Sequence, residues 1–360
     1  MYQTSTVFVF EFFTGGGWPS GDLPEGLAAE ALGMLWALLT DFRRWGMVRT
    51  MTSLDPRFEE RISGLNRKSL PADIVVPALP GNYHETYHAL LQRCDAVLII
   101  APETDGILAN LTASAELAGI PLLCSDSASA ATAGNKAECN RLFGKAKLPI
   151  PQSLVSSFAA APEMANRIGY PLVIKPVDGI GSEGVSLIST LAELPAGLAL
   201  LRRATISPQI LLQSFVHGIH ASASLLVTGG RCIPMSLNRQ LIEAGLPFRY
   251  QGSQVPLICD DGNRALDLAC SAVRLIPGLN GYVGVDLVLA DEGPRLIEIN
   301  PRLTTSYIGL RQVSQTNLAQ AIWNACINGV LPDRVPLTGE ALIRKDDHPS
   351  WNLRDPTIGQ

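Results

Sequence analysis

The sequence predicts an α/β protein in which a parallel α/β domain precedes two subdomains that contain antiparallel strands. Three observations support this class. Short apolar runs alternate with helical stretches near the amino terminus, strands joined by short turns follow, and 47% of the 360 residues are hydrophobic, which is enough to fill more than one core. We expect domains at 1–125, 126–216 and 217–343, followed by a loose tail at 344–360.

The first domain is expected to be a sheet whose strands are buried on both faces, because uniformly apolar strands that alternate with helices favour parallel pairing. Its predicted strands are Thr6–Phe12, Asp95–Ile100 and Pro121–Cys124, and its predicted helices are Leu27–Trp45 and Thr104–Ala118. The loop Thr14–Gly17 follows the first strand, at the edge where open α/β sheets bind ligands. It is either a substrate contact or a flexible turn.

The rest of the chain is expected to pair its strands in antiparallel fashion, because short turns separate consecutive apolar runs. The predicted helices are Asn135–Lys147, Arg264–Leu275 and Asn317–Asn328. The predicted strands are Leu172–Pro176, Gly184–Ile188, Gln209–Phe215, Ala221–Thr228, Arg231–Ser236, Tyr282–Leu289 and Arg295–Ile299. The last two flank a four-residue turn and should therefore form a hairpin.

Charge and cysteine usage narrow the class of protein. Lys and Arg total 28 against 33 Asp and Glu, a net charge of −5, so nucleic acid is not an expected partner. The seven cysteines are scattered without CxxC spacing, which predicts reduced thiols and a cytoplasmic protein. The apolar amino-terminal run has no basic segment before it, and Glu30 and Gly33 interrupt the next one. We expect neither a signal peptide nor a membrane span, and assembly as a homodimer stays open.

The segment GVDLVLADEGPRLIEINPR carries the strongest chemical signal. A hairpin would place Asp286 beside Glu298, while the alternation of side chains along a strand puts Glu298, Asn300 and Arg302 on one face. Two carboxylates and an amide oxygen suit Mg²⁺, or Mn²⁺, held against phosphates, and Arg302 can neutralise developing negative charge. The alternative is a solvated sheet face, but the apolar neighbours of these residues favour the metal site.

A second signal joins Lys136 to Lys175, which ends an apolar strand and precedes the glycine-containing loop DGIGSEG. Lysine side chains and free backbone N–H groups bind phosphate. Gly181 and Gly184 would let the loop approach a ligand closely, and Ser182 adds a hydroxyl donor. The alternative is an ordinary hairpin turn. The loop is not of the Walker A type, because no Gly-Lys-Ser/Thr follows it.

The segment QILLQSFVHGIH brings Gln213, Phe215 and Val216 to the end of a strand, where backbone groups can bond an adenine edge. His220 lies just beyond and is either a ligand contact or structural. Arg239 follows a strand that we expect to face the same cleft. It is therefore counted with Arg302 and Ser182 among the candidate catalytic residues, with an exposed arginine as the alternative.

In order and spacing these motifs resemble the ATP-grasp superfamily over about residues 130–330. They are NK at Asn135-Lys136, VIKP at 173–176, the loop GIGSEGV, QSFVHG at 213–218, and GVDLVL followed by EINPR. Five motifs in order are far more specific than any one of them. The resemblance implies an ATP-grasp fold, in which two α+β subdomains clasp ATP, preceded by a Rossmann-like parallel α/β domain.

The resemblance also implies roles for the candidate residues. Lys136 and Lys175 would contact the ATP phosphates, the glycine loop would close over them, and the segment at 213–216 would line the adenine slot. The two carboxylates and the amide of the hairpin would hold Mg²⁺, and Arg302 would steady an acyl phosphate. Many relatives have Glu where this chain has Gln213 and His220, so the way in which the ribose is held and the role of His220 stay open.

The implied reaction is an ATP-dependent ligation of a small-molecule carboxylate to an amine through an acyl phosphate. The opening VFVFEFFTGGG resembles tyramine–glutamate ligases of methanofuran biosynthesis, in one-carbon metabolism, which implies the glutamate γ-carboxylate and tyramine as substrates. The alternatives are another carboxylate–amine or dipeptide ligase, or a nucleotide-binding regulatory module without turnover. A dinucleotide-dependent oxidoreductase would need GxGxxG after the first strand, where this chain has GGGWPSG.

Overall fold

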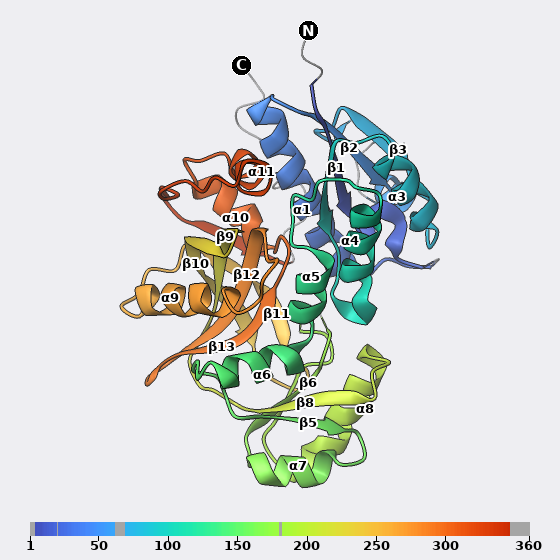
Figure 1. Cartoon of the computed structure of the whole chain (residues 1–360). Helices are drawn as coiled ribbons and strands as arrows, with labels where there is room; N and C mark the ends of the chain where they lie inside the picture. Colours follow the sequence, from blue (N-terminus) through green and yellow to red (C-terminus); the bar gives the residue numbers. More distant parts are fainter. Residues whose placement is uncertain (1–3, 20, 62–68, 180–181, 346–360) are drawn as a thin grey trace.

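The computed structural model describes residues 4–19, 21–61, 69–179 and 182–345, which form three β-sheets (Figure 1). The first sheet is parallel, in the order β3-β2-β1-β4. Its strands are β1 (Thr6–Glu11), β2 (Arg49–Leu54), β3 (Ile74–Pro77) and β4 (Ala96–Ile100). The predicted parallel domain is confirmed, but the segment Pro121–Cys124 contributes only an isolated bridge between Leu122 and Val97.

Helices cover both faces of this sheet, so that β1, β2 and β4 are almost wholly buried. They are α1 (Glu25–Trp45), α2 (Pro56–Arg61), α3 (Tyr83–Leu91) and α4 (Ile107–Leu117), with a 3-10 turn η3 (Thr104–Gly106) after β4. The Thr14–Gly17 loop lies in a single π-helical turn, η1 (Phe13–Gly17). Gly16 has a φ of 92° there, and a Cβ would lie 2.8 Å from the Leu79 carbonyl oxygen, so this turn requires glycine.

The second sheet is antiparallel, in the order β5-β8-β6-β7. Its strands are β5 (Ser153–Ser157), β6 (Leu172–Pro176), β7 (Ser186–Ile188) and β8 (Gln209–Ser214). The helices α7 (Ala161–Ile168) and α8 (Leu194–Ala204) pack on it, with a 3-10 turn η4 (Leu191–Glu193) before α8. Figure 1 shows this layer at the end of the molecule opposite the parallel sheet.

The third sheet is the largest and is antiparallel, in the order β13-β12-β9-β10-β11-β14. Its strands are β9 (Ile219–Thr228), β10 (Arg231–Glu243), β11 (Arg249–Val255), β12 (Gly281–Ala290), β13 (Gly293–Asn300) and β14 (Ala341–Arg344). The predicted hairpin is β12–β13. The strand β10 runs well past its predicted end at Ser236, which changes the setting of Arg239.

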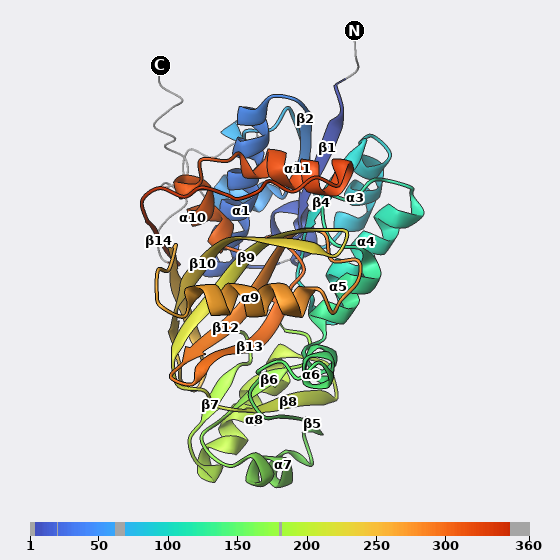
Figure 2. The same cartoon turned by 60° about the vertical axis from the view of Figure 1, so that its left-hand side comes forward.

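Helices lie on both faces of this large sheet. Figure 2 shows α9 (Gly262–Val273) across one face, while α10 (Ser306–Val313) and α11 (Leu318–Asn328) lie on the side of α1. Neighbouring β9 residues divide between the two cores, since Leu225 packs with α9 and Leu226 with α10 and α11. Two capped helices, α5 (Ser127–Gly134) and α6 (Lys136–Lys145), connect the parallel domain to the second sheet.

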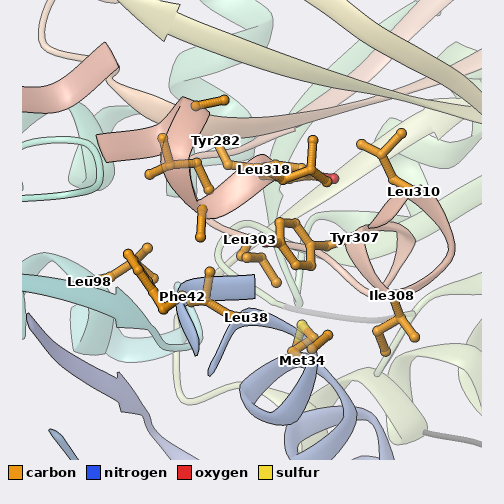
Figure 3. Close-up of a cluster of buried hydrophobic side chains, with 14 of the residues drawn as sticks. Met34, Leu38, Phe42, Leu98, Tyr282, Leu303, Tyr307, Ile308, Leu310 and Leu318 are labelled. Carbon is orange, nitrogen blue, oxygen red and sulfur yellow. The ribbon is translucent and has the colours of Figure 1, made fainter. Parts of the chain in front are cut away.

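One hydrophobic core joins the parallel domain to the large sheet (Figure 3). It combines Leu38 and Phe42 of α1 with Tyr282 of β12 and Tyr307 of α10. The Tyr307 hydroxyl donates to the buried Asp41 carboxylate of α1 at 2.7 Å. Burial of large side chains on this scale fixes the two parts relative to each other, so that a site between them has a stable shape.

The carboxyl-terminal residues begin as ordered structure. Arg344 ends β14, which pairs with β11, and the Lys345 N–H donates to the Gln251 carbonyl at 2.9 Å. The Lys345 ammonium lies 3.3 Å from the Glu30 carboxylate of α1. The first two residues of the predicted tail at 344–360 are thus ordered, and its remaining residues, 346–360, lie outside the described part.

Two further findings concern the class of protein. None of the helices in the described ranges is long and apolar enough to cross a membrane. All seven cysteines are free thiols in the structure.

Candidate nucleotide and substrate site

Two adjoining cavities lie along the large sheet. The inter-sheet cavity, of about 780 Å³, lies between the two antiparallel sheets and is lined by residues that include Lys136, Lys175, Gln213 and Val288. The junction chamber, of about 960 Å³, lies where the large sheet meets the parallel domain. The two cavities share a wall made of Ser182, Gln240, Ile242, Asp286 and Glu298. A ligand in one cavity would therefore reach a ligand in the other at this wall.

Asp286 and Glu298 form the centre of the shared wall. They are directly paired across β12 and β13, as the hairpin prediction required. Burial, and then the charge of Glu298, raise the pKa of Asp286 to about 8. Burial also works to raise the pKa of Glu298, but Lys136 and Lys175 outweigh it and hold that pKa below its ordinary value. Two carboxylates this close repel each other, and a cation between them would relieve the repulsion.

Two amides hold the Asp286 carboxylate in place. The Asn300 side-chain nitrogen donates to one of its oxygens at 3.3 Å, and the Gln240 side-chain nitrogen donates to the other at 3.0 Å. The Asn300 amide oxygen is then the atom that this side chain can offer to a cation. Gln240 was not among the predicted residues, although it is the neighbour of Arg239 and lines both cavities.

Lys136 connects the glycine-loop region to the shared wall. It begins α6, whose N-cap is Asn135, and its backbone N–H donates to the Val177 carbonyl at 2.7 Å. Its ammonium donates to the Gly179 carbonyl at 2.6 Å and lies 3.2 Å from the Glu298 carboxylate. Burial disfavours the charge of Lys136, but Glu298 and then Glu103 outweigh it and raise the lysine pKa. Lys136 thus remains a cation.

Lys175 occupies the end of β6 and is only 3% exposed. Burial is the main cause that lowers its pKa to about 8, and Glu298 opposes this shift. A buried ammonium is unfavourable unless an opposite charge lies close to it. An anionic ligand such as a phosphate group would stabilise it.

The described part of the glycine loop reaches both cavities through Ser182, whose φ of 70° lies in the left-handed region that non-glycine residues seldom adopt. Gly184 also has a positive φ, of 71°, and faces Ala204 of α8. Gly181 lies outside the described residues.

The end of β8, the segment that follows it and the start of β9 line the inter-sheet cavity with Gln213, Phe215, Val216 and His220. The Gln213 side chain is already engaged, since its nitrogen donates to the Ser153 hydroxyl at 2.9 Å. The Phe215 N–H donates to the Pro171 carbonyl at 3.2 Å and is not available to a ligand. Burial lowers the pKa of His220, so its imidazole is neutral near pH 7.

The donor set at the shared wall fits a divalent cation that ligand phosphates help to bind. The described residues contain no group of three or more His, Cys, Asp or Glu side chains that could hold a metal by itself. Mg²⁺ is commonly held by one or two carboxylates together with phosphate oxygens and water. Asp286, Glu298 and the Asn300 amide oxygen meet that requirement.

Arg302 lines the junction chamber, and its guanidinium forms a double hydrogen bond with Glu103. Nε lies 2.9 Å from one carboxylate oxygen and Nη2 lies 3.1 Å from the other. Glu103 follows β4 and was missed in the sequence, although it stands at the sheet edge where α/β folds place ligands. For Arg239 the structure agrees with the alternative of an exposed arginine and not with the candidate catalytic role. Arg239 is exposed and lines neither cavity, because Gln240 occupies the inward position of β10.

The remaining wall of the junction chamber comes from parts of the chain outside the five ATP-grasp motifs. Its acidic members are Glu11 and Glu30, and burial raises the pKa of Glu11 to about 7. Its hydroxyl groups come from Ser222, Tyr250, Thr304, Thr305 and Ser306, and its apolar side chains from Phe13, Leu27, Ala31, Met34 and Ile100. Glu11 interrupts an apolar strand, the same signal that pointed to Glu298, and on that ground it was recognisable in the sequence.

Comparison with known families agrees with this architecture. Residues 133–306 match the ATP-grasp domain family, and residues 48–130 match the pre ATP-grasp 3 domain family. These matches cover the two antiparallel sheets except β14, and the strands β2, β3 and β4 of the parallel sheet. The chain belongs to the ATP-grasp superfamily.

Individual relatives of the chain include two kinds of ligase. Tyramine–L-glutamate ligase of Methanocaldococcus jannaschii is 30% identical over 220 residues, which are 61% of this chain and 59% of the relative. D-alanine–D-alanine ligase of Mycolicibacterium smegmatis is 29% identical over 254 residues, 65% of this chain and 61% of the relative. Each alignment thus spans less than two thirds of the relative's length.

A crystal structure from Archaeoglobus fulgidus, assigned to the ATP-grasp superfamily, superposes with a TM-score of 0.67 at 26% identity and covers 94% of this chain and 92% of that one. The similarity therefore includes the parallel domain as well as the two antiparallel sheets. It confirms the predicted fold class, an ATP-grasp fold preceded by a Rossmann-like parallel domain.

Proposed function

We infer that this protein is an ATP-dependent carboxylate–amine ligase, with ATP in the inter-sheet cavity and the two substrates in the junction chamber. The observation that carries the inference is the shared wall. Asp286 and Glu298 separate a cavity that contains two lysines from a chamber that contains Arg302. Phosphoryl transfer depends mainly on positioning and charge neutralisation, and the wall stands where the γ-phosphate would meet an acceptor carboxylate.

The residues divide the work as follows. Lys136 and Lys175 bind the phosphates, and Phe215 and Val216 contact the base. When Mg²⁺ is bound by Asp286, Glu298 and Asn300, it neutralises charge on the transferred phosphate. The substrate carboxylate attacks the γ-phosphate to give an acyl phosphate and ADP. Arg302 stabilises the negative charge of the acyl phosphate. The amine then displaces inorganic phosphate from the acyl phosphate to form the amide. Ser182, in the loop that borders both cavities, helps to exclude water.

For the substrates we favour the glutamate γ-carboxylate and tyramine, as in methanofuran-type cofactor biosynthesis. The similarity to tyramine–L-glutamate ligase supports this choice. So does the chamber, whose acidic groups suit a substrate ammonium and whose apolar wall of Phe13, Leu27 and Met34 suits an aryl-alkyl chain. Another amino-acid or dipeptide ligase is the second candidate, favoured by the similarity to D-alanine–D-alanine ligases.

The test measures ADP and phosphate release by the purified protein with ATP and Mg²⁺. Glutamate is supplied with and without tyramine, in parallel with D-alanine and with pairs of L-amino acids. Release that needs both glutamate and tyramine supports the full proposal. Release with a different pair retains the ligase mechanism and overturns the substrates. ATP binding without release under any pair favours a regulatory nucleotide-binding module.

A further inference from the structure

The ion pair between Arg302 and Glu103 bridges two parts of the fold at the edge of the junction chamber. Arg302 follows β13 of the large sheet, and Glu103 follows β4 of the parallel sheet. Both of the Glu103 oxygens accept from the guanidinium, at 2.9 and 3.1 Å. A planar guanidinium that makes two hydrogen bonds to one carboxylate cannot rotate without breaking both of them.

Glu103 itself is held from behind. A Cβ on Gly134 of α5 would lie only 2.9 Å from the Glu103 Cβ, so a glycine at this point lets α5 pack tightly against it. Two residues on, the Asp105 N–H donates to the Asp178 carboxylate at 3.2 Å, in the loop that follows β6. The segment that carries Glu103 thus packs against α5 and is hydrogen-bonded to the loop that follows β6.

The geometry leaves part of the guanidinium for a ligand. Of its five N–H bonds, two donate to Glu103 and one donates to the Leu303 carbonyl at 3.3 Å. Arg302 lines the chamber, whereas Glu103 is not among the residues that line it. Glu103 therefore contacts the arginine and not the substrates.

We propose that Glu103 is a positioning residue for the ligation reaction: it fixes the Arg302 guanidinium so that the remaining N–H bonds face the acyl phosphate before the reaction begins. The proposal rests on the proposed ligase function. A donor that is already oriented needs no reorganisation when charge develops, and this is the condition under which such donors accelerate reactions most. Loss of one donor of this kind costs about 100- to 1,000-fold in kcat, and loss of its orientation alone should cost part of that.

The fold provides a matched control in a second ion pair between the same two parts of the molecule. Arg311 of α10 lies 2.8 Å from Asp41 of α1, and the two side chains are 12% and 6% exposed. The corresponding values for Arg302 and Glu103 are 12% and 4%. Neither Asp41 nor Arg311 lines the inter-sheet cavity or the junction chamber. Asp41→Asn therefore weakens a comparable bridge away from the chamber.

The experiment compares Glu103→Gln with Asp41→Asn in steady-state kinetics and thermal unfolding. We expect Glu103→Gln to lower kcat about 10- to 100-fold. The KM for ATP should change less, because Glu298 still pairs with Lys136. Asp41→Asn should lower the melting temperature at least as much and leave kcat within about twofold. In an Arg302→Lys background, Glu103→Gln should cost little further activity, because the arginine it orients is gone. Equal losses of kcat in the two single variants would overturn the proposal.

A second measurement does not depend on turnover and so separates this proposal from the ligase assignment. The Arg302 Nε–H is observed by nitrogen-15 NMR and assigned with Arg302→Lys. We expect an ordered, slowly exchanging signal in the wild type and in Asp41→Asn, and a mobile or absent one in Glu103→Gln. An Arg302 that stays ordered without the Glu103 carboxylate would contradict the positioning role. A wild type that releases no ADP would contradict only the ligase function.

Discussion

The inter-sheet cavity and the junction chamber share Asp286 and Glu298, but different parts of the chain build the rest of them. The described residues that line the inter-sheet cavity all fall within the matched ATP-grasp range at 133–306. The junction chamber draws Glu11, Phe13, Leu27 and Glu30 from a segment that precedes both matched family ranges. Similarity to the family therefore supports a nucleotide in the inter-sheet cavity more directly than it supports particular substrates in the junction chamber. Mutations in one cavity should change the KM for its own ligand and leave the KM for the other ligand nearly constant.

Glu298→Gln should have the largest effect, because it alters the wall that both cavities share. The change removes the partner of Lys136 and one of the two adjacent carboxylates. We expect kcat for ADP release to fall at least about 100-fold, with a weaker dependence on Mg²⁺. Glu292→Gln is the control, since Glu292 is exposed in the turn of the same hairpin. A Glu298→Gln enzyme with near-normal kcat would show that the shared wall takes no part in the reaction.

Lys175→Met should affect the nucleotide side alone. We expect the KM for ATP to rise about 10- to 100-fold while the KM values for the acid and the amine stay nearly constant, because a buried phosphate-binding charge is lost. Lys145→Met removes a lysine that is exposed at the end of α6 and should leave all three constants unchanged. Equal increases in all three constants would show that the two cavities do not act separately.

The same variant should be more stable than the wild type when no nucleotide is present. Burial lowers the pKa of Lys175 from 10.5 to about 8. The charged lysine therefore lowers the free energy of unfolding at all pH values below about 8. This penalty shrinks between pH 8 and 10.5 and vanishes above. Lys175→Met should therefore gain up to about 3 kcal/mol of unfolding free energy at pH 7. Urea unfolding at pH 7 and pH 10 measures it, and a gain that does not shrink at pH 10 would contradict the cause.

Leu27→Ala should affect the chamber side alone. Leu27 is half-buried on α1 and forms part of the apolar wall, so its truncation should raise the KM for the apolar substrate about 10-fold. The KM for ATP should not change. Leu117→Ala, at a position on α4 that is 90% exposed, makes the same chemical change away from the chamber. If the KM for ATP alone responds to Leu27→Ala, the chamber is not where the substrates bind.

The two cavities also differ in how far the sequence predicts them. Asp286 and Glu298 could be paired in advance because a short hairpin fixes its own register. The lysines belonged to motifs whose order was specific. The junction chamber depends on how α1 and β1 pack against the large sheet, a contact made by hydrophobic residues far apart in the chain. No local pattern encodes that contact, so Glu30 and Tyr250 were not predicted.

Strand length limited the prediction in a second way. The predicted β10 ended at Ser236, whereas the strand continues to Glu243 with a register shift between Pro234 and Ser236. In a strand, a displacement by one residue moves a side chain to the other face. For that reason the cavity receives Gln240 where the sequence favoured Arg239.

This last difference yields the smallest expected effect, and the sharpest contrast between neighbours. Arg239→Ala should change kcat and every KM by no more than about twofold, because the side chain is exposed and lies on the outer face. Gln240→Ala should lower kcat about 10-fold, because Asp286 loses the amide that donates to it at 3.0 Å. Steady-state kinetics of the two single variants measures both. If Arg239→Ala proved the more harmful, Arg239 would have to face the cavities in place of Gln240, and Gln240 would leave the shared wall.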